Sequence, residues 1–222
     1  MFDSSDLFSN GTACSDVLLK EQARFRHRSS YHARKRIFDL AGAIALLPVM
    51  LGVAIVVMIA NRKLNPGPLF YSQTRMGKDC VPFQALKFRT MICADTIARG
   101  AFDALEHDRI TPFGRLLRKT RLDELPQTLN ILRGDMSLIG PRPDFYDHAI
   151  VYLDAVHGYR ERHSIRPGIS GYAQVRHGYI EGIEGVRAKV TADLQYIAKA
   201  STWVDMKIAW ATIKVVLGRQ GM

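Results

Sequence analysis

Residue types that build disulfide frameworks and metal clusters are scarce in this sequence. Its three cysteines, Cys14, Cys80 and Cys93, are scattered and form neither a CxxC pair nor a zinc spacing. We therefore expect reduced thiols in a cytoplasmic setting. The seven histidines include no HExxH pair, so we interpret them as structural or surface groups. No internal repeat or low-complexity segment is present, and 222 residues suit one compact domain with extensions.

Acidic residues are outnumbered, since 21 Asp and Glu face 31 Lys and Arg and give a formal net charge of +10. Such an excess predicts an anionic partner: nucleic acid, a phosphorylated metabolite or anionic lipid. The sequence has no basic–aromatic RNP pattern and no zinc-finger spacing, which argues against nucleic acid. A hydrophobic fraction of 47% excludes a disordered chain and a membrane protein of many spans.

One long hydrophobic run, residues 40–60, carries no charge at all. About 20 such residues suffice to cross a bilayer. The run follows a polar stretch, residues 1–33, and therefore starts too late for an ordinary signal peptide. No small-residue cleavage site follows it, so we interpret it as a retained membrane element.

Pro48 lies near the middle of this run and would remove a helical hydrogen bond there. Cations flank both ends, at 34–36 and at 62–63, so the positive-inside rule gives no direction. A re-entrant helix that breaks at Pro48 and leaves by the face it entered explains both facts. An ordinary spanning helix with a proline kink is equally compatible with them.

After a rigid turn at residues 65–68, two short strands are expected at 69–71 and 83–86, around a turn at 77–79. The second strand leads into Lys87 and Arg89, which alternation places on the same side. They are candidates for a two-pronged phosphate clamp. A solvated basic strand face explains the same pattern.

Two adjacent carboxylates, Asp123 and Glu124, follow a basic run that includes Arg118. Leucines behind them recur at helical spacing, which predicts a helix with Asp123 as its cap and Gly134 at its end. The acids would then point to different targets, because neighbours in a helix do not face each other. An N-cap with surface ion pairs is the plainer interpretation.

Arg142 lies between two prolines, which suits a guanidinium that must be aimed, although a rigid turn is the competing explanation. Thr111 and Pro112 predict a helix start. Residues 145–163 read as a helix and 166–174 as a Gly-rich loop. A C-terminal apolar stripe predicts an amphipathic helix, which could face either a core or a membrane interface: Trp203, Met206, Trp210, Ile213 and Leu217.

Four motifs together resemble the bacterial sugar transferases, or monotopic phosphoglycosyl transferases. In chain order they are KFRTM at 87–91, RKTRLDELPQ at 118–127, GDMSLIGPRP at 134–143 and RPGISGYAQV at 166–175. A hydrophobic segment with a central proline precedes them, and the resemblance covers residues 34–220. Many members have Ser-Pro at the membrane break, whereas Leu47 precedes Pro48 here.

The resemblance implies transfer of a hexose 1-phosphate from a UDP-sugar to undecaprenyl phosphate, with release of UMP, as the first membrane step of exopolysaccharide synthesis. It assigns the family's aspartate nucleophile to Asp123, through a covalent aspartyl-phosphosugar. It assigns the magnesium-binding glutamate to Glu124, where Mg²⁺ would neutralise the diphosphate. The candidates to hold substrate phosphates are Arg118, Arg142, Lys87 and Arg89. No residue decides which sugar is transferred.

We therefore expect an α+β, mainly helical, monotopic membrane protein with an N-terminal re-entrant helix, a small sheet and amphipathic interfacial helices. Its expected parts are a polar tail (1–33), the membrane helix broken at Pro48 (34–63) and a cytoplasmic catalytic domain (64–222). We expect it at the cytoplasmic face of a bacterial inner membrane, as a monomer or a homodimer. A non-enzymatic basic adaptor that binds anionic lipid is the alternative, but it leaves the order of the four motifs unexplained.

Overall fold

The computed structural model describes residues 29–92, 109–177 and 182–218. Its first half contains α2 (Ser29–Leu64), β1 (Phe70–Met76), η1 (Lys78–Cys80), β2 (Pro82–Phe88), α3 (Pro112–Lys119), η3 (Leu122–Glu124) and α4 (Gln127–Arg133). Its second half contains β3 (Ser137–Ile139), α5 (Tyr146–Ala155), η4 (Glu161–Ser164), β4 (Gly168–Ser170), α6 (Tyr172–His177), α7 (Gly182–Lys199) and α8 (Thr202–Leu217). This is the mainly helical α+β fold with small sheets that the sequence predicts. Most of the expected tail and two of the three cysteines lie outside the described residues.

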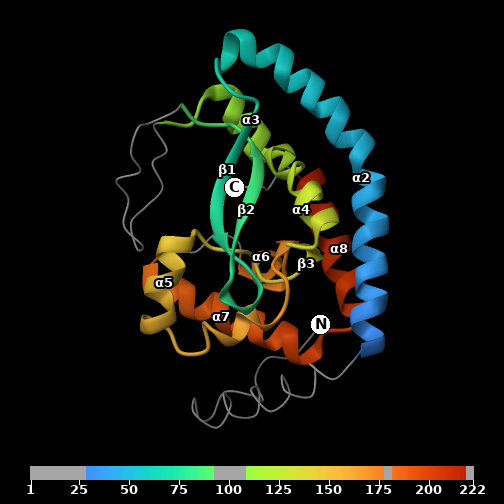
Figure 1. Cartoon of the computed structure of the whole chain (residues 1–222), viewed down its shortest axis with the longest axis vertical. Coiled ribbons are helices and arrows are strands. Elements are labelled where there is room, and N and C mark those ends of the chain that lie inside the picture. Colours follow the sequence, from blue (N-terminus) through green and yellow to red (C-terminus); the bar gives the residue numbers. More distant parts are fainter. Residues whose placement is uncertain (1–28, 93–108, 178–181, 219–222) are drawn as a thin grey trace.

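Helix α2 runs along one whole side of the molecule and is bent around it (Figure 1). It begins at Ser29 rather than at residue 34, and it continues through Pro48 without interruption. The structure thus shows a bent helix where the sequence predicted a break. By length and composition, α2 could cross a membrane.

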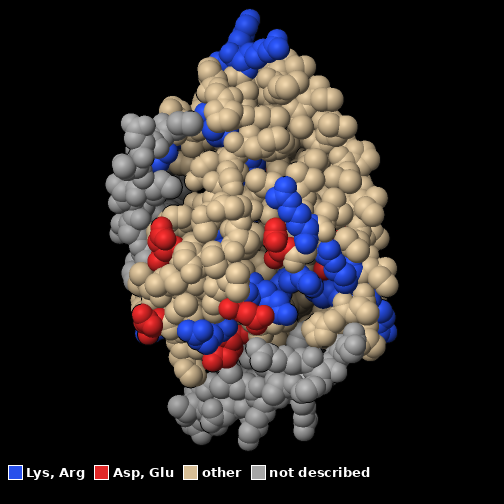
Figure 2. Space-filling view, in the orientation of Figure 1, with Lys and Arg blue, Asp and Glu red and all other residues tan. Residues whose placement is uncertain are grey.

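The outer face of α2 is apolar and exposed, and Figure 2 shows an uncharged surface along most of the helix, with cations at its far end. Large exposed side chains on it include Ile44, Val49, Leu51, Ile55, Val56, Met58 and Ile59. An exposed apolar face of this extent is consistent with membrane association.

The inner face of α2 is attached to the domain by polar contacts. Asp39, only 2% exposed, accepts hydrogen bonds from Ser137 Oγ at 2.9 Å and from Leu138 N at 3.0 Å. Arg36 donates to the carbonyls of residues 131 and 132, at the C-terminal end of α4. The first turns of α2 are therefore part of the domain and not a free tail.

Strands β1 and β2 form the expected antiparallel hairpin, from Phe70 opposite Phe88 to Met76 opposite Pro82. The hairpin is longer than the sequence suggested, and it lies at the centre of the view in Figure 1. Its second strand carries Lys87 to Glu124 in η3.

A second, parallel pair of strands joins β3 to β4, with Ser137 opposite Gly168 and Ile139 opposite Ser170. The chains approach so closely that a Cβ atom at Gly168 would lie 2.1 Å from the backbone nitrogen of Gly140. Only glycine fits there, because a side chain would overlap the neighbouring backbone. This pairing fixes the start of the segment that carries Arg142.

The largest hydrophobic core joins the start of α2 to the hairpin end, β3, α5, α7 and α8, and it includes Met76, Tyr159, Val190, Ile197 and Ile208. Helix α5 is shorter than the predicted helix at 145–163, because the chain turns after Ala155 and re-forms as η4. Ile139, which directly precedes the segment 140–144, is part of this core. The core thereby fixes the start of the segment that carries Arg142.

Helix α8 forms as the C-terminal stripe predicts, but its stripe does not face a core. Trp203, Met206, Trp210 and Ile213 are 64%, 50%, 61% and 48% exposed. Lys207 lies over the Trp203 ring and Lys214 over the Trp210 ring, at 5.3 and 5.8 Å. Exposed tryptophans beside lysines are typical of a helix in a membrane interface, so the core alternative is wrong.

Candidate active site

The two acids lie in a short 3₁₀ turn and not at the cap of a longer helix. Helix α3 starts as predicted, with the Thr111 side chain accepting from Gly114 N at 3.0 Å. It ends at Lys119, and Arg121 follows with a left-handed φ of 56°, which is rare for a side chain of this size. The chain then forms η3, and α4 begins only at Gln127. The prediction that Asp123 caps α4 is therefore wrong, whereas Gly134 ends α4 as expected, with φ 97°.

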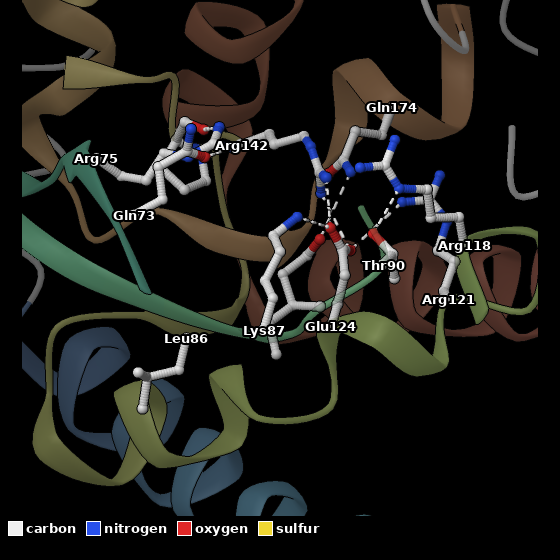
Figure 3. A network of polar contacts seen from close by, with 12 residues as sticks. Gln73, Arg75, Leu86, Lys87, Thr90, Arg118, Arg121, Glu124, Arg142 and Gln174 are labelled. Carbon is white, nitrogen blue, oxygen red and sulfur yellow. Dashed lines mark hydrogen bonds and ion pairs between the residues drawn. The ribbon is translucent and has the colours of Figure 1, made fainter. Parts of the chain in front are cut away.

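Glu124 is buried under cations that come from separate elements (Figure 3). Its carboxylate accepts from Lys87 Nζ at 2.7 Å and from both terminal nitrogens of Arg142, and Arg121 lies at 3.7 Å. Burial alone would raise the pKa of Glu124, but Arg142 and Lys87 outweigh it and hold the pKa well below its usual range. Glu124 is thus ionised at neutral pH.

Asp123 is in a different state, although it is the adjacent residue. It is 7% exposed and makes no hydrogen bond or ion pair with any described residue. Burial raises the pKa of Asp123 to about 6, against the lowering influence of Lys87. A carboxylate with this pKa is about nine-tenths ionised at pH 7 and has free lone pairs. The two adjacent acids thus have different environments, and that they act on different targets stays a prediction.

Of the predicted phosphate ligands, the structure brings Lys87, Arg142 and Arg118 to the acids. Arg118 donates from Nε to Thr90 Oγ1 at 2.9 Å, and its charge lowers the pKa of Asp123. Arg89 is not brought there: its guanidinium donates to the carbonyls of residues 65, 68 and 91. The two-pronged clamp of Lys87 and Arg89 is therefore not formed, and a phosphate-binding role for Arg89 stays a prediction.

Arg142 is aimed by its own backbone, which is held from several sides. Arg162, with a fully buried side chain, donates to the Arg142 carbonyl at 2.7 Å. It also pairs with Asp144 at 2.6 Å and with Asp193 at 2.8 Å. Arg75 donates to the next carbonyl, that of residue 143, at 2.9 Å. Sequence reasoning missed Arg162, because its partners lie 18 to 31 residues away and no spacing announces them.

Gln174 is a further residue at the site that the sequence did not single out, although it lies in the fourth motif. Figure 3 shows its side chain directed toward Arg142 and Arg118. Its amide nitrogen donates to the Ile169 carbonyl at 3.5 Å, while its oxygen is buried and finds no partner among the residues that the structure describes. It is a polar group available to a ligand.

The expected magnesium site can be compared with these donors. In the described part of the chain, no three His, Cys, Asp or Glu side chains are grouped to hold a metal ion. Mg²⁺ needs no such cage, because it often binds through one or two carboxylates together with substrate phosphates. The ionised Glu124 fits that role, although Lys87 and Arg142 would compete with the ion for its oxygens.

The structure thus combines a buried pair of carboxylates, surrounded by cations, with an apolar helix long enough to cross a membrane. The family model described as bacterial sugar transferase matches residues 30–219. The chain belongs to this family, and it is therefore an enzyme, a phosphoglycosyl transferase.

Its relatives include proteins of different length and named substrate. A UDP-glucose:undecaprenyl-phosphate glucose-1-phosphate transferase of Caulobacter vibrioides is 40% identical, over 86% of this chain and 72% of the relative. A UDP-N-acetylgalactosamine-undecaprenyl-phosphate N-acetylgalactosaminephosphotransferase of Aeromonas hydrophila is 39% identical, over 82% of this chain and 43% of the relative. The exopolysaccharide production protein PSS of Rhizobium leguminosarum is 36% identical, over 83% and 96%.

Proposed function

We propose that the chain transfers a hexose 1-phosphate from a UDP-sugar to undecaprenyl phosphate, in two steps through a covalent intermediate on Asp123. Relatives are named for transfer of glucose 1-phosphate or for an N-acetylgalactosamine donor, so the particular sugar stays open. The observation that carries the mechanism is the division between the acids. Glu124 accepts from Lys87 and Arg142, whereas Asp123 has no hydrogen bond or ion pair with a described residue and has a pKa of about 6.

In the first step an oxygen of Asp123 attacks the phosphorus that carries the sugar. The bond from this phosphorus to the bridging oxygen of the diphosphate breaks, and UMP leaves with the bonding pair. A covalent step of this kind divides one difficult transfer into two easier ones. Asp123 suits the role because it is ionised at neutral pH and has no hydrogen bond to give up.

In the second step a phosphate oxygen of undecaprenyl phosphate attacks the same phosphorus. The bond from phosphorus to Asp123 breaks, which frees the carboxylate and releases undecaprenyl-diphospho-sugar. No net proton is taken up, because each step exchanges one phosphorus–oxygen bond for another.

Cations around the two acids would offset the negative charge of the phosphoryl groups in both steps. Lys87, Arg118 and Arg142 surround the acids and would bind phosphoryl oxygens, whose negative charge they offset in a largely buried site. Mg²⁺ held by Glu124 would neutralise part of the diphosphate charge. Arg162 would keep Arg142 in position through the Arg142 carbonyl.

The acceptor is a lipid, and we place the protein on the cytoplasmic face of a bacterial inner membrane. The apolar outer face of α2 would lie in the bilayer, and the tryptophan stripe of α8 at its surface. A re-entrant course for α2 would bring both of its charged ends to one face, with the bend near Pro48 at the deepest point. Backbone carbonyls freed by the proline would then need partners inside the membrane.

A UMP-release assay tests this function. Purified protein in detergent is mixed with Mg²⁺, undecaprenyl phosphate and each of several UDP-sugars. The parent should release UMP with at least one of them, and Asp123→Asn should not, while Asp154→Asn, an exposed acid of α5, should match the parent. Equal release by Asp123→Asn and the parent would refute the assignment of the nucleophile. No release with any UDP-sugar would refute the proposed donor.

A further inference from the structure

Arg75 is a third cation at the pocket that Lys87 and Arg142 share. A void of about 10 Å³ lies next to the two cations that bind Glu124, and its walls are Arg75, Ala85, Lys87, Gln127, Arg142 and Pro143. A space of this size holds about one oxygen-sized group. Strand β1 carries Arg75 on the same face of the hairpin on which β2 carries Ala85 and Lys87.

The direct contacts of the Arg75 guanidinium are with neutral groups. One terminal nitrogen donates to the Pro143 carbonyl at 2.9 Å and the other contacts the Gln73 side-chain oxygen. The Nε–H is buried and has no hydrogen-bond partner in the described part of the chain. Among the described residues, no carboxylate forms an ion pair with Arg75.

The walls of this pocket carry three cations and no acid. Lys87 and Arg142 form ion pairs with Glu124, whereas Arg75 forms none with a described residue, although Asp144 and Glu124 lie near enough to act on its charge. Burial lowers the pKa of Arg75 and the neighbouring Arg142 lowers it further, while Asp144 and Glu124 offset part of this effect, so a further anion beside the guanidinium would stabilise its ionised form. A buried unpaired donor that faces such a space is costly unless a ligand pairs with it.

We propose that Arg75 completes an oxyanion subsite with Lys87 and Arg142, in which its Nε–H donates to one phosphoryl oxygen of the substrate. The inference rests on the proposed function, and it adds a binding residue that the sequence motifs do not mark. The phosphoryl oxygen could belong to the donor diphosphate or to the phosphate of the lipid acceptor. A purely structural Arg75, which only ties the hairpin to residue 143, is the competing explanation.

The test compares ligand binding, and not only turnover, in Arg75→Gln and Arg75→Lys. Binding of UDP, with uridine as the phosphate-free control, is followed by the ligand-induced shift of the melting temperature and by competition with the UDP-sugar. Binding of undecaprenyl phosphate is followed through its KM. Gln73→Ala is the matched control, because it removes a neighbour of Arg75 and leaves the charge in place.

We expect Arg75→Gln either to weaken UDP binding or to raise the KM for undecaprenyl phosphate, by about tenfold or more, since a charge-assisted hydrogen bond is lost. Arg75→Lys, which keeps the charge but lacks Nε, should be intermediate, and uridine binding and Gln73→Ala should resemble the parent. A loss confined to UDP assigns the subsite to the donor, and a loss confined to the lipid assigns it to the acceptor.

The proposal would be overturned if a folded Arg75→Gln bound UDP as the parent does and had the same KM for undecaprenyl phosphate. It would also be overturned if Gln73→Ala weakened binding as much as Arg75→Gln. If Arg75→Gln does not fold, Arg75→Lys decides alone, and parent-like constants for it would overturn the proposal. A parent that releases no UMP would refute the proposed function instead, because the binding constants for UDP are measured without turnover.

Discussion

The buried Arg162 offers a quantitative test of how the site is held. Its side chain is fully buried and lies between Asp144 and Asp193, while one terminal nitrogen donates to the Arg142 carbonyl. In Arg162→Met, Asp144 keeps Lys189 and the Tyr159 hydroxyl, but Asp193 is left 1% exposed and without its partner. Breaking a buried pair in this way costs about 3–5 kcal/mol.

For a chain of this length, 1 kcal/mol corresponds to about 2–4 °C, so the melting temperature of Arg162→Met should fall by roughly 6–20 °C. The double variant Arg162→Met with Asp193→Leu replaces the pair by apolar groups, and it should recover much of that loss. Its turnover should stay about 10- to 100-fold low, because the backbone of Arg142 still lacks its donor. Thermal unfolding in detergent and UMP release measure the two effects separately.

Two results would refute this reasoning. An unchanged melting temperature in Arg162→Met would show that the buried pair contributes little to stability. Full turnover in the stable double variant would show that Arg162 does not position Arg142.

Three further predictions concern the acid limb of the reaction and the membrane. Turnover should fall as the pH drops through about 6, because Asp123 then takes up a proton. Lys87 lowers the pKa of Asp123, so Lys87→Met should move this fall in turnover to higher pH. UMP release measured between about pH 5 and 8 tests this, and the same pH dependence in Lys87→Met and the parent would contradict it. Replacing both tryptophans of α8 by serine should weaken sedimentation with lipid vesicles severalfold, whereas Ile150→Ser on α5 should not, and equal effects would contradict an interfacial α8. A single cysteine at position 29, in a cysteine-free background, should be protected from a membrane-impermeant thiol reagent in intact cells. Adding Pro48→Leu should make it partly accessible to the reagent. Ready labelling with Pro48 in place would show that α2 spans the membrane.

Much of the fold could be predicted because its signals are local. Thr111 followed by a proline marks the start of α3, and Gly134 ends α4 with the left-handed φ that glycine adopts without strain. The hairpin follows from two apolar runs around a turn with Gly77. The two candidate acids could also be found from local sequence, since Asp123 and Glu124 are adjacent.

The rest depends on contacts between distant residues. Arg121 adopts a left-handed conformation that its residue type does not suggest, and this turn moves the acids out of α4. Arg89 looked equivalent to Lys87 on an alternating strand, but the carbonyls of residues 65 and 68 bind its guanidinium. Arg162 could not be found, because only the fold brings Asp193 to it.

The central claim is that Asp123 carries the sugar phosphate between donor and acceptor, and intact-protein mass spectrometry tests it most directly. The protein is incubated with Mg²⁺ and a UDP-sugar that supports turnover, in the absence of lipid. The account predicts release of about one UMP per site, with a matching gain of one hexose phosphate on the peptide that contains Asp123. Asp123→Asn should gain no mass. A parent enzyme that stays unmodified and releases UMP only once undecaprenyl phosphate is added would contradict the account and indicate direct transfer.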